Sequence, residues 1–308
     1  MVDMGTNIYI NLSRQGAEFE QIKGNYIYNR YDLQRKKAYL LKVCDDKQVY
    51  FIPLHIADGD AELGISLADL PLEIVRNAIH FVFKQFPVIK RIRFFSACNK
   101  IGICNSHNYF TIPLPENIEE LHNRSSAKSR QTMRRKVRIL EKDLGDFTIQ
   151  EFTADTVPEK IIVDYFNMKQ ATHNVDYHMT AREYLQKYYV TNVYVLSVKQ
   201  QTGAIILSCE QCPGVYLENL TYDVQLAKYS LGSILYECFI EKLVEKGKKE
   251  LFLAGGAIAY KRHYGSVERI VYDGIVYRCF AKELSIQLYR LTKRIIRRVV
   301  KTIFFWRS

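Results

Sequence analysis

A short polar turn, Tyr229-Ser230-Leu231-Gly232-Ser233, opens a predicted helix and could bind an anion. The first-turn amides of a helix have no carbonyl partner within the helix, and they lie at the positive end of its dipole. Gly232 has no Cβ, so a ligand can approach the backbone closely, and Ser230 or Ser233 can cap the helix or donate a hydrogen bond. Lys228 adds positive charge beside the turn. The pattern is typical of a diphosphate site, although a capped helix start is also common without a ligand.

Strand and helix patterns on both sides position this turn. Apolar periodicity predicts a helix from Leu231 to Lys246, which ends at Gly247 and is followed by a short strand, Leu251–Leu253. The elements expected before the turn are the strand Phe147–Phe152, the helices Pro158–Ala171 and Thr180–Tyr189, and the strands Val193–Val198, Ala204–Cys209 and Val215–Tyr222. Two further strands are expected after it, around Arg269–Tyr272 and Ile275–Cys279.

The first 115 residues also mix strands with a helix. Strands are expected at Ile8–Leu12, Ala38–Val43, Gln48–Ile56, Arg91–Ser96 and Tyr109–Ile112. Pro71 begins a helix whose apolar residues lie three and four positions apart and form one stripe, as expected for packing on a sheet. Pro113-Leu114-Pro115 marks a hinge. Since the chain is about twice the ~150 residues typical of one domain, we predict an α+β protein with modules at residues 1–115 and 116–280.

Composition excludes several classes of protein. Apolar residues make up 48% of the 308, and 15 glycines and 7 prolines are too few for long disordered segments. No apolar run approaches the ~20 residues that cross a bilayer, and the chain does not start with a signal-peptide pattern. A cytoplasmic protein is therefore expected. The seven cysteines are an odd number, and Cys209-Glu210-Gln211-Cys212 lacks a second ligand pair, so we expect neither disulfides nor a metal.

The net charge of +11 is concentrated in two segments. Residues 121–142 contain eight basic residues and one acidic residue, and residues 282–307 have the same balance. In the first segment, Ser125-Ser126 precede a predicted helix, Ala127–Leu144, whose arginines surround a narrow apolar seam. Such a basic face is either solvated or in contact with phosphates.

Several motifs together resemble the signature of CelD-like acetyltransferases of the GNAT superfamily. The matching residues are Tyr222-Asp223, Tyr229-Ser230-Leu231-Gly232, Gly247, Gly255-Gly256, Lys261 and Tyr264-Gly265, with Lys128-Ser129-Arg130-Gln131 at the start. The resemblance spans about Ser126 to Tyr277, and it departs from the family at Leu231, where proline is common. It implies a GNAT fold, a mixed and mostly antiparallel sheet flanked by helices. The N-terminal half resembles a degenerate first module, as in the tandem Fem-type transferases.

The resemblance also implies a cofactor and a reaction. In that family the turn after the fourth strand holds the pyrophosphate of coenzyme A; the residues matching it here are Lys228, Tyr229, Ser230, Leu231, Gly232 and Ser233. The acyl group passes directly from the thioester of acetyl-CoA or another acyl-CoA to an amine, so a base must remove the ammonium proton. Asp223 and Glu218, beside the turn, are the candidate bases. Asp223 could instead satisfy backbone donors in a turn.

The acceptor is expected near two further segments. His173, Tyr177 and His178 lie between the two helices that border the acceptor pocket in the superfamily. Lys261 and Tyr264, after Gly255-Gly256, match a family segment that could hold an acceptor phosphate. Exposed histidines without a role, and a solvated charge on a loop, remain the alternatives at these positions.

The C-terminal residues 281–308 predict a basic amphipathic helix. Its apolar residues from Leu284 to Ile303 lie on one side and its basic residues on the other, and Phe304-Phe305-Trp306 follow. Such a helix suits the headgroup layer of an anionic membrane, which residues 284–307 would contact at the inner face of the cell membrane. A helix that packs on the domain, or that binds a protein or nucleic acid, is the alternative.

The sequence thus predicts an acyl-CoA-dependent N-acyltransferase. The expected acceptor is an amine-bearing small molecule, most simply an amino sugar used in bacterial surface polysaccharide and cell-envelope synthesis, and no metal is required. Two alternatives stay open. One is a Fem-type transferase that uses aminoacyl-tRNA, in which the two basic helices would bind nucleic acid. The other is a non-catalytic membrane adaptor with the same fold.

Overall fold

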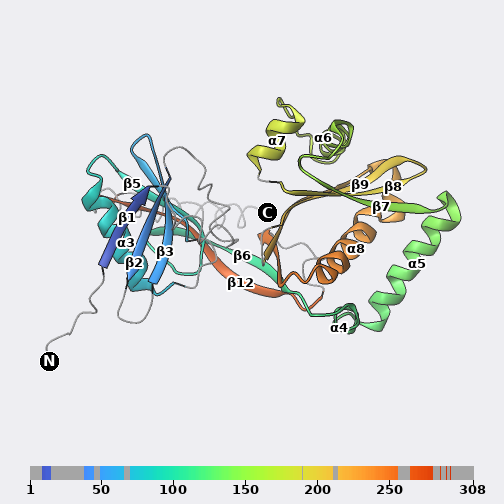
Figure 1. Cartoon of the computed structure of the whole chain (residues 1–308), viewed down its shortest axis with the longest axis horizontal. Helices are drawn as coiled ribbons and strands as arrows, with labels where there is room; N and C mark the ends of the chain where they lie inside the picture. Colours follow the sequence, from blue (N-terminus) through green and yellow to red (C-terminus); the bar gives the residue numbers. More distant parts are fainter. Residues whose placement is uncertain are drawn as a thin grey trace, which may run out of the picture. The chain divides into compact units, whose positions relative to one another are not determined.

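The computed structural model describes residues 9–14, 38–44, 49–65, 70–188, 190–210, 214–255 and 264–279, together with residues 285, 289 and 292. The chain forms two compact units (Figure 1). The first unit consists mainly of residues 27–107 and of those from 270 onward, and the second mainly of residues 108–269.

Among its described residues, the first unit is a sheet with helix α3 packed on it. Its elements are β1 (Tyr9–Arg14), β2 (Ala38–Cys44), β3 (Val49–Ala57), β4 (Asp60–Leu63), α3 (Leu72–Gln85), β5 (Arg91–Ala97) and most of β12 (Val267–Tyr277). Strands β1 to β4 pair antiparallel in sequence order, α3 connects β4 to the parallel strand β5, and β12 pairs antiparallel with β5. Ile74, Val75, Ala78, Ile79 and Val82 of α3 are buried in the core of this unit, which confirms the predicted apolar stripe.

The second unit contains the predicted anion-binding turn. Its elements are most of β6 (Ile103–Pro113), α4 (Ile118–Asn123), α5 (Ala127–Leu144), β7 (Phe147–Thr153), α6 (Glu159–His173), α7 (Ala181–Lys187), β8 (Asn192–Val198), β9 (Gln201–Glu210), β10 (Gly214–Tyr222), the 3₁₀ helix η1 (Val224–Tyr229), α8 (Leu231–Glu245) and β11 (Glu250–Gly255). Strands β7 to β10 pair antiparallel in sequence order, and α8 connects β10 to the parallel strand β11. Strand β6 pairs antiparallel with β11.

The two units therefore repeat one topology. Each has four antiparallel strands, a helix, a fifth strand parallel to the fourth, and a sixth strand antiparallel to the fifth. The sixth strands are exchanged along the sequence, because β6 follows β5 but pairs with β11, and β12 follows β11 but pairs with β5. The α+β class and the tandem organisation predicted from sequence are thus confirmed. The exchange also makes the units differ from the predicted ranges 1–115 and 116–280 at these two strands.

Helices cover both faces of the sheet in the second unit. Tyr194 and Leu196 of β8 pack in one core with α8 and α5, whereas the alternating residues Val193 and Val195 pack in another core with α6 and α7. Since neighbouring side chains of a strand point to opposite faces, the two helix pairs lie on opposite sides of the sheet. Figure 1 shows α8 on one side and α6 with α7 on the other.

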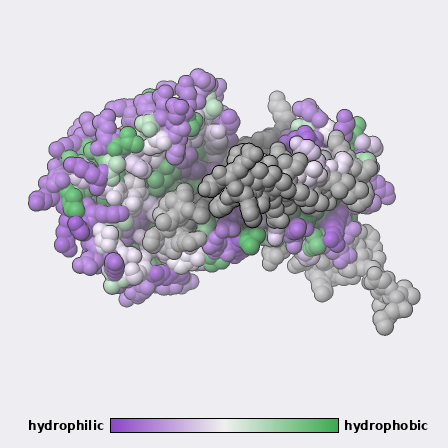
Figure 2. All heavy atoms as spheres, turned by 180° about the vertical axis from the view of Figure 1, so that it is seen from behind, coloured by the Kyte–Doolittle hydropathy of each residue, from purple (hydrophilic) through white to green (hydrophobic). Residues whose placement is uncertain are grey.

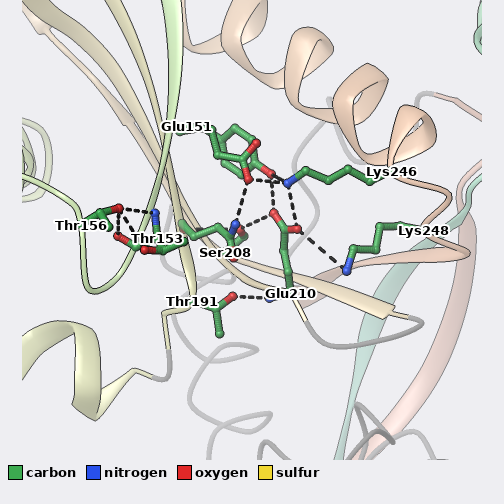
Figure 3. A network of polar contacts seen from close by, with 10 residues as sticks. Glu151, Thr153, Thr156, Thr191, Ser208, Glu210, Lys246 and Lys248 are labelled. Atoms are coloured by element: carbon green, nitrogen blue, oxygen red, sulfur yellow. Dashed lines mark hydrogen bonds and ion pairs between the residues drawn. The ribbon is translucent and has the colours of Figure 1, made fainter.

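A polar network joins the C-terminal end of α8 to the sheet (Figure 3). Lys246, which follows α8, donates hydrogen bonds to Glu151 of β7 (2.5 Å), to the Tyr194 hydroxyl (2.6 Å) and to Glu210 of β9 (3.1 Å). The Tyr194 hydroxyl donates a short hydrogen bond to Glu210, and the Lys248 ammonium lies 4.0 Å from the same carboxylate. The network ties three strands of the sheet to the end of α8 that lies opposite the predicted anion site.

Some expected elements differ from those observed. One strand, β12, replaces the two predicted around Arg269–Tyr272 and Ile275–Cys279, and its pairing with β5 shifts register at Asp273. The helix η1 lies between β10 and α8, where a plain turn was expected. The C-terminal segment 281–308 lies outside the described residues except for Ser285, Tyr289 and Thr292, which are helical and exposed. Within the part of the chain that is described, no helix combines the length and apolarity that a membrane span requires.

Candidate active site

The start of α8 leaves backbone amides available for a ligand. Ser230 has left-handed backbone angles (φ 57°, ψ 39°) that end η1 and begin α8. Its carbonyl accepts hydrogen bonds from the amides of Ser233 (2.9 Å) and Ile234 (3.2 Å). The Leu231 and Gly232 amides precede these, and α8 contains no carbonyl one turn earlier for them. The side chain of Ser230 makes no capping hydrogen bond, so of the two roles considered for it only a contact with a ligand stays a prediction.

Ser230, Gly232 and Ser233 of this helix start border a cavity of about 630 Å³ between α5 and α8. From α8 and the residue before it, Ser230, Gly232, Ser233, Tyr236 and Glu237 line the cavity; from α5 and the residues before it, Ser125, Lys128, Ser129, Arg130, Thr132, Met133 and Lys136 do; Leu220, Tyr222, Ala227 and Tyr264 complete the wall. Two lysines and many hydroxyl groups thus surround the helix start. Arg130 is occupied elsewhere, because it donates to the carbonyls of His122 and Ser125.

Gly232 has a packing role in addition to its place in the cavity wall. A Cβ at this position would lie 3.1 Å from Leu220 Cδ2 and 3.2 Å from Tyr222 Cδ1. The glycine therefore lets α8 approach β10 closely as well as exposing the backbone. Leu231 is fully buried, and a Cβ on Gly203 would lie 2.7 Å from its Cδ1. At this position, where the resembling family commonly has proline, the leucine side chain anchors the helix start in the core.

The other residues predicted to hold the cofactor lie beside the cavity. Tyr229 is buried and belongs to the core of the second unit. The Lys228 ammonium lies 4.7 Å from the centre of the Tyr229 ring, and a hydrogen bond with that tyrosine raises the pKa of Lys228. Neither residue lines the cavity. Lys128 and Lys136 of α5 are the lysines that do, and they were not predicted as site residues.

Strands β10 and β11 separate next to the helix start. They pair over Gly214–Tyr216 and Glu250–Phe252, and β10 then continues to Tyr222 without a described β11 partner. The pairing of β10 with β9 shifts register between Leu217 and Asn219, around Glu218. Leu220 and Tyr222, in the stretch beyond the β11 pairing, also line the cavity. The anion site thus borders the gap that opens between the two parallel strands.

The two carboxylates predicted as bases lie outside the cavity wall. The Asp223 side chain accepts a hydrogen bond from the amide of Gln225 (2.9 Å) and caps η1, and its own amide donates to the Gly203 carbonyl (2.9 Å). This is the backbone-satisfying role expected of a turn aspartate. Glu218 is partly buried at the irregular step of β10.

A third carboxylate, Glu237, lies in the cavity wall and was not predicted. It is one helical turn beyond Ser233, and its Oε2 atom is buried with no hydrogen-bond partner among the described residues. Burial and then the nearby Glu241 raise the pKa of Glu237, and a hydrogen bond with Tyr264 opposes them in part. Glu237, Glu241 and His122 have side-chain atoms within 4.8 Å of one another. The four-residue spacing of Ser233, Glu237 and Glu241 in a largely apolar helix is the sequence signal that could have found this group.

We expect Glu237→Gln to raise the melting temperature at neutral pH. The pKa of Glu237 in the folded protein lies above its ordinary value of 4.5, so the folded protein binds more protons than the unfolded chain between the two values. Stability is therefore lost as pH rises through this window, and glutamine removes the loss. The gain should shrink toward pH 4.5, as thermal unfolding over a pH series would show. A gain that is equal at all pH values would contradict the assigned shift.

Of the predicted acceptor residues, His173 and Tyr264 line hollows, whereas Tyr177 and His178 do not line them. His173 and Thr172 of α6 line a hollow of about 340 Å³ with Leu220, Thr221 and Tyr222, so the end of β10 borders both this hollow and the main cavity. Tyr177 instead packs on aromatic rings, with its ring centre 4.8 Å from that of Phe166. The exposed His178 lies 3.7 Å from the Asp176 carboxylate. Tyr264 lines the main cavity, and Lys261 lies outside the described residues.

Comparison with known proteins defines the class. Residues 127–262 match the family model described as an acetyltransferase (GNAT) domain. This segment contains α5, β10, the helix start of α8 and the lysines of the cavity. This part of the chain therefore matches a GNAT domain, and the match supports an N-acyltransferase. No curated protein matches the sequence.

Solved structures share the fold at low sequence identity. FemX has a TM-score of 0.59 at 8% identity, over 91% of this chain and 99% of that one. The C-terminal domain of a protein described as a lysylphosphatidylglycerol synthetase from Agrobacterium fabrum has a TM-score of 0.51 at 14% identity, over 77% and 83%. L-PGS from Bacillus licheniformis has a TM-score of 0.50 at 12% identity, over 74% and 80%. The GNAT fold predicted from sequence is confirmed, while none of these comparisons tests a CelD-like subtype.

Proposed function

We propose that this protein transfers an acyl group from acetyl-CoA, or a related acyl-CoA, to the amino group of an amino sugar. One observation supports the donor above all. The first-turn amides of α8, Lys128 and Lys136 meet in one cavity at the point where β10 leaves β11. Amides at a helix start bind phosphate oxygens, and lysines neutralise the remaining charge. A thioester arm could run from this cavity into the gap between the strands.

The chemistry needs few groups. The amine, once it has lost a proton, attacks the thioester carbonyl; a C–N bond forms, the C–S bond breaks, and the leaving thiolate takes up a proton. Backbone amides on the open stretch of β10 can polarise the carbonyl. The carboxylates proposed to accept the ammonium proton are Asp223, Glu218 and Glu237, of which Glu237 lines the cavity. His173 would contact the acceptor from the other side of β10.

A binding and turnover experiment tests the donor. Acetyl-CoA should raise the melting temperature of the full-length protein, and free thiol should be released when amino sugars, free or nucleotide-linked, are added. If no coenzyme A compound binds and no amine consumes a thioester, the non-catalytic alternative gains. If aminoacyl-tRNA binds with strong salt dependence while acetyl-CoA does not, the Fem-type alternative replaces the proposal. The fold shared with FemX and the basic face of α5 are what favour that second candidate.

We further propose that the segment 284–307 holds the protein at the inner face of the cell membrane. The proposal rests on the basic amphipathic pattern of the sequence. Deleting residues 284–308 should abolish co-sedimentation with vesicles that contain anionic lipid and leave acetyl-CoA binding unchanged. Undiminished co-sedimentation of the shortened protein would remove the membrane from the proposal.

A further inference from the structure

Helix α5 presents a row of basic side chains that extends away from the cavity. The row consists of Lys128, Arg134, Arg135, Arg138 and Lys142, all exposed. At 3.6 residues per turn these positions fall within about 120° of the helix circumference, and the row is about 21 Å long. The acidic residues of α5, Glu141 and Asp143, lie outside this arc. The face of this unit seen in Figure 2 is mostly hydrophilic, with small separate hydrophobic spots.

The helix that carries the row is packed on the core, and the row is not neutralised within the described part of the chain. None of its five side chains forms an ion pair with a described residue. The opposite side of α5 holds the helix in place, because Leu140 is buried and Met133 and Val137 pack against the same core. A fixed row of unpaired cations costs stability through mutual repulsion, so it is better suited to an anionic partner than to a solvated surface.

The row also extends beyond what a free nucleotide can use. Lys128 borders the cavity with Lys136 and the helix start, which together suit a phosphate group. Arg134 and Arg138 instead line a second hollow of about 410 Å³ that shares Arg130, Met133 and Glu237 with the first. Lys142 lies farther along the helix, about 21 Å from Lys128. The basic side chains therefore continue from the proposed phosphate site along α5 for about 21 Å, which is the length of a short helix of a partner protein.

We propose that α5 docks a small acidic carrier protein that presents the acyl group on a phosphopantetheine arm. This inference rests on the proposed function, because the arm's phosphate would occupy the α8 site and its thioester the gap beside β10. The carrier's acidic helix would then lie along the α5 row, since carboxylates four residues apart match the four-residue spacing of Arg134, Arg138 and Lys142. Ile139, 40% exposed beside the row, offers an apolar contact within the charged surface.

The test compares two donors on two charge-reversed variants. Arg134→Glu, Arg138→Glu and Lys142→Glu are combined in one variant. Lys160→Glu, Arg182→Glu and Lys187→Glu, on α6 and α7 across the sheet, form the control with the same change in net charge. All six residues are exposed, so both variants should fold. Fluorescence anisotropy of labelled acetyl-carrier protein at low salt measures docking, and the thermal shift with acetyl-CoA reports the cavity.

The docking variant should bind the acetyl-carrier protein about tenfold or more weakly, while the control variant binds it as the unmodified protein does. Acetyl-CoA should bind all three proteins equally. Acetyl-CoA binding without carrier binding, or carrier binding that both variants keep, would overturn the docking and leave the proposed function standing. If the docking variant binds the carrier protein normally but loses affinity for RNA or for anionic vesicles, the carrier docking is also overturned and the proposed function stands. Loss of both donors from the unmodified protein would refute the proposed function itself.

Discussion

Replacing Ser233 by aspartate will weaken acetyl-CoA binding by about 100-fold or more while the protein keeps its fold. Ser233 is exposed in the cavity wall, in the first turn of α8 and next to the amides of Leu231 and Gly232. A carboxylate there would face the diphosphate at its proposed site, and two like charges ~4 Å apart repel by a few kcal/mol at a partly screened site. The same carboxylate is favourable for the helix, because an acidic residue in the first turn interacts well with the dipole. Isothermal titration with acetyl-CoA measures the loss.

Ser233→Asn is the matched control, since asparagine has nearly the same size as aspartate and carries no charge. It should lose less than about threefold in affinity, as expected for one exposed hydrogen bond. Gly232 is a poorer position for this experiment, because any side chain there would meet Leu220 and Tyr222 and disturb the packing of α8 on β10. If Asp and Asn at position 233 bind acetyl-CoA equally, the phosphates lie elsewhere and the assignment of the helix start is wrong.

The sequence was sufficient for most of the elements because their patterns are local, but it missed β4, α4 and η1. Local apolar patterns identified the strands from β7 to β10, and Ser and Gly at one end with Gly at the other identified α8. The exchange of β6 and β12 between the units could not be predicted from local sequence patterns. Which strand pairs with which depends on contacts between residues far apart in the chain, and periodicity carries no information on them. The predicted module boundary at residue 115 was therefore placed by Pro113 and Pro115 alone.

The part of the site formed by the backbone of one helix start could be predicted from the sequence. The part formed by side chains of separate elements was harder to predict. The start of α8 was predicted from a glycine and two serines, a pattern that also occurs without a ligand, and phosphate binding there stays a prediction. Lys128, Lys136 and Glu237 were missed, since only tertiary structure brings α5 beside α8. Asp223 was chosen for its place beside the turn, yet its carboxylate is held by the Gln225 amide. Whether any of these residues acts in catalysis stays a prediction.

Lys246→Met should destabilise the protein by about 2 kcal/mol, because the network at the far end of α8 would lose its central cation. Removing this ammonium leaves the Glu210 carboxylate, 5% exposed, with the more distant Lys248 as its cation. Losing one partner of a fully buried ion pair costs about 3–5 kcal/mol, and Lys246 is 31% exposed, so a smaller loss is expected. Urea unfolding of both proteins at pH 7 measures the difference.

The pH dependence of this loss identifies its cause. Burial raises the pKa of Glu151, but the hydrogen bond and charge of Lys246, together with hydrogen bonds from Asn192 and Tyr194, outweigh burial and hold the pKa below its ordinary value of 4.5. A lowered carboxyl pKa contributes stability above the unfolded value, and this contribution is lost as pH falls through the folded value. The difference between the unmodified protein and Lys246→Met should therefore shrink below pH 4.5. Lys248→Met, whose ammonium is 4.0 Å from Glu210, is the control and should cost less than about 1 kcal/mol. Equal losses in the two variants would mean that the aliphatic stems, and not the buried charge of Glu210, stabilise this end of α8.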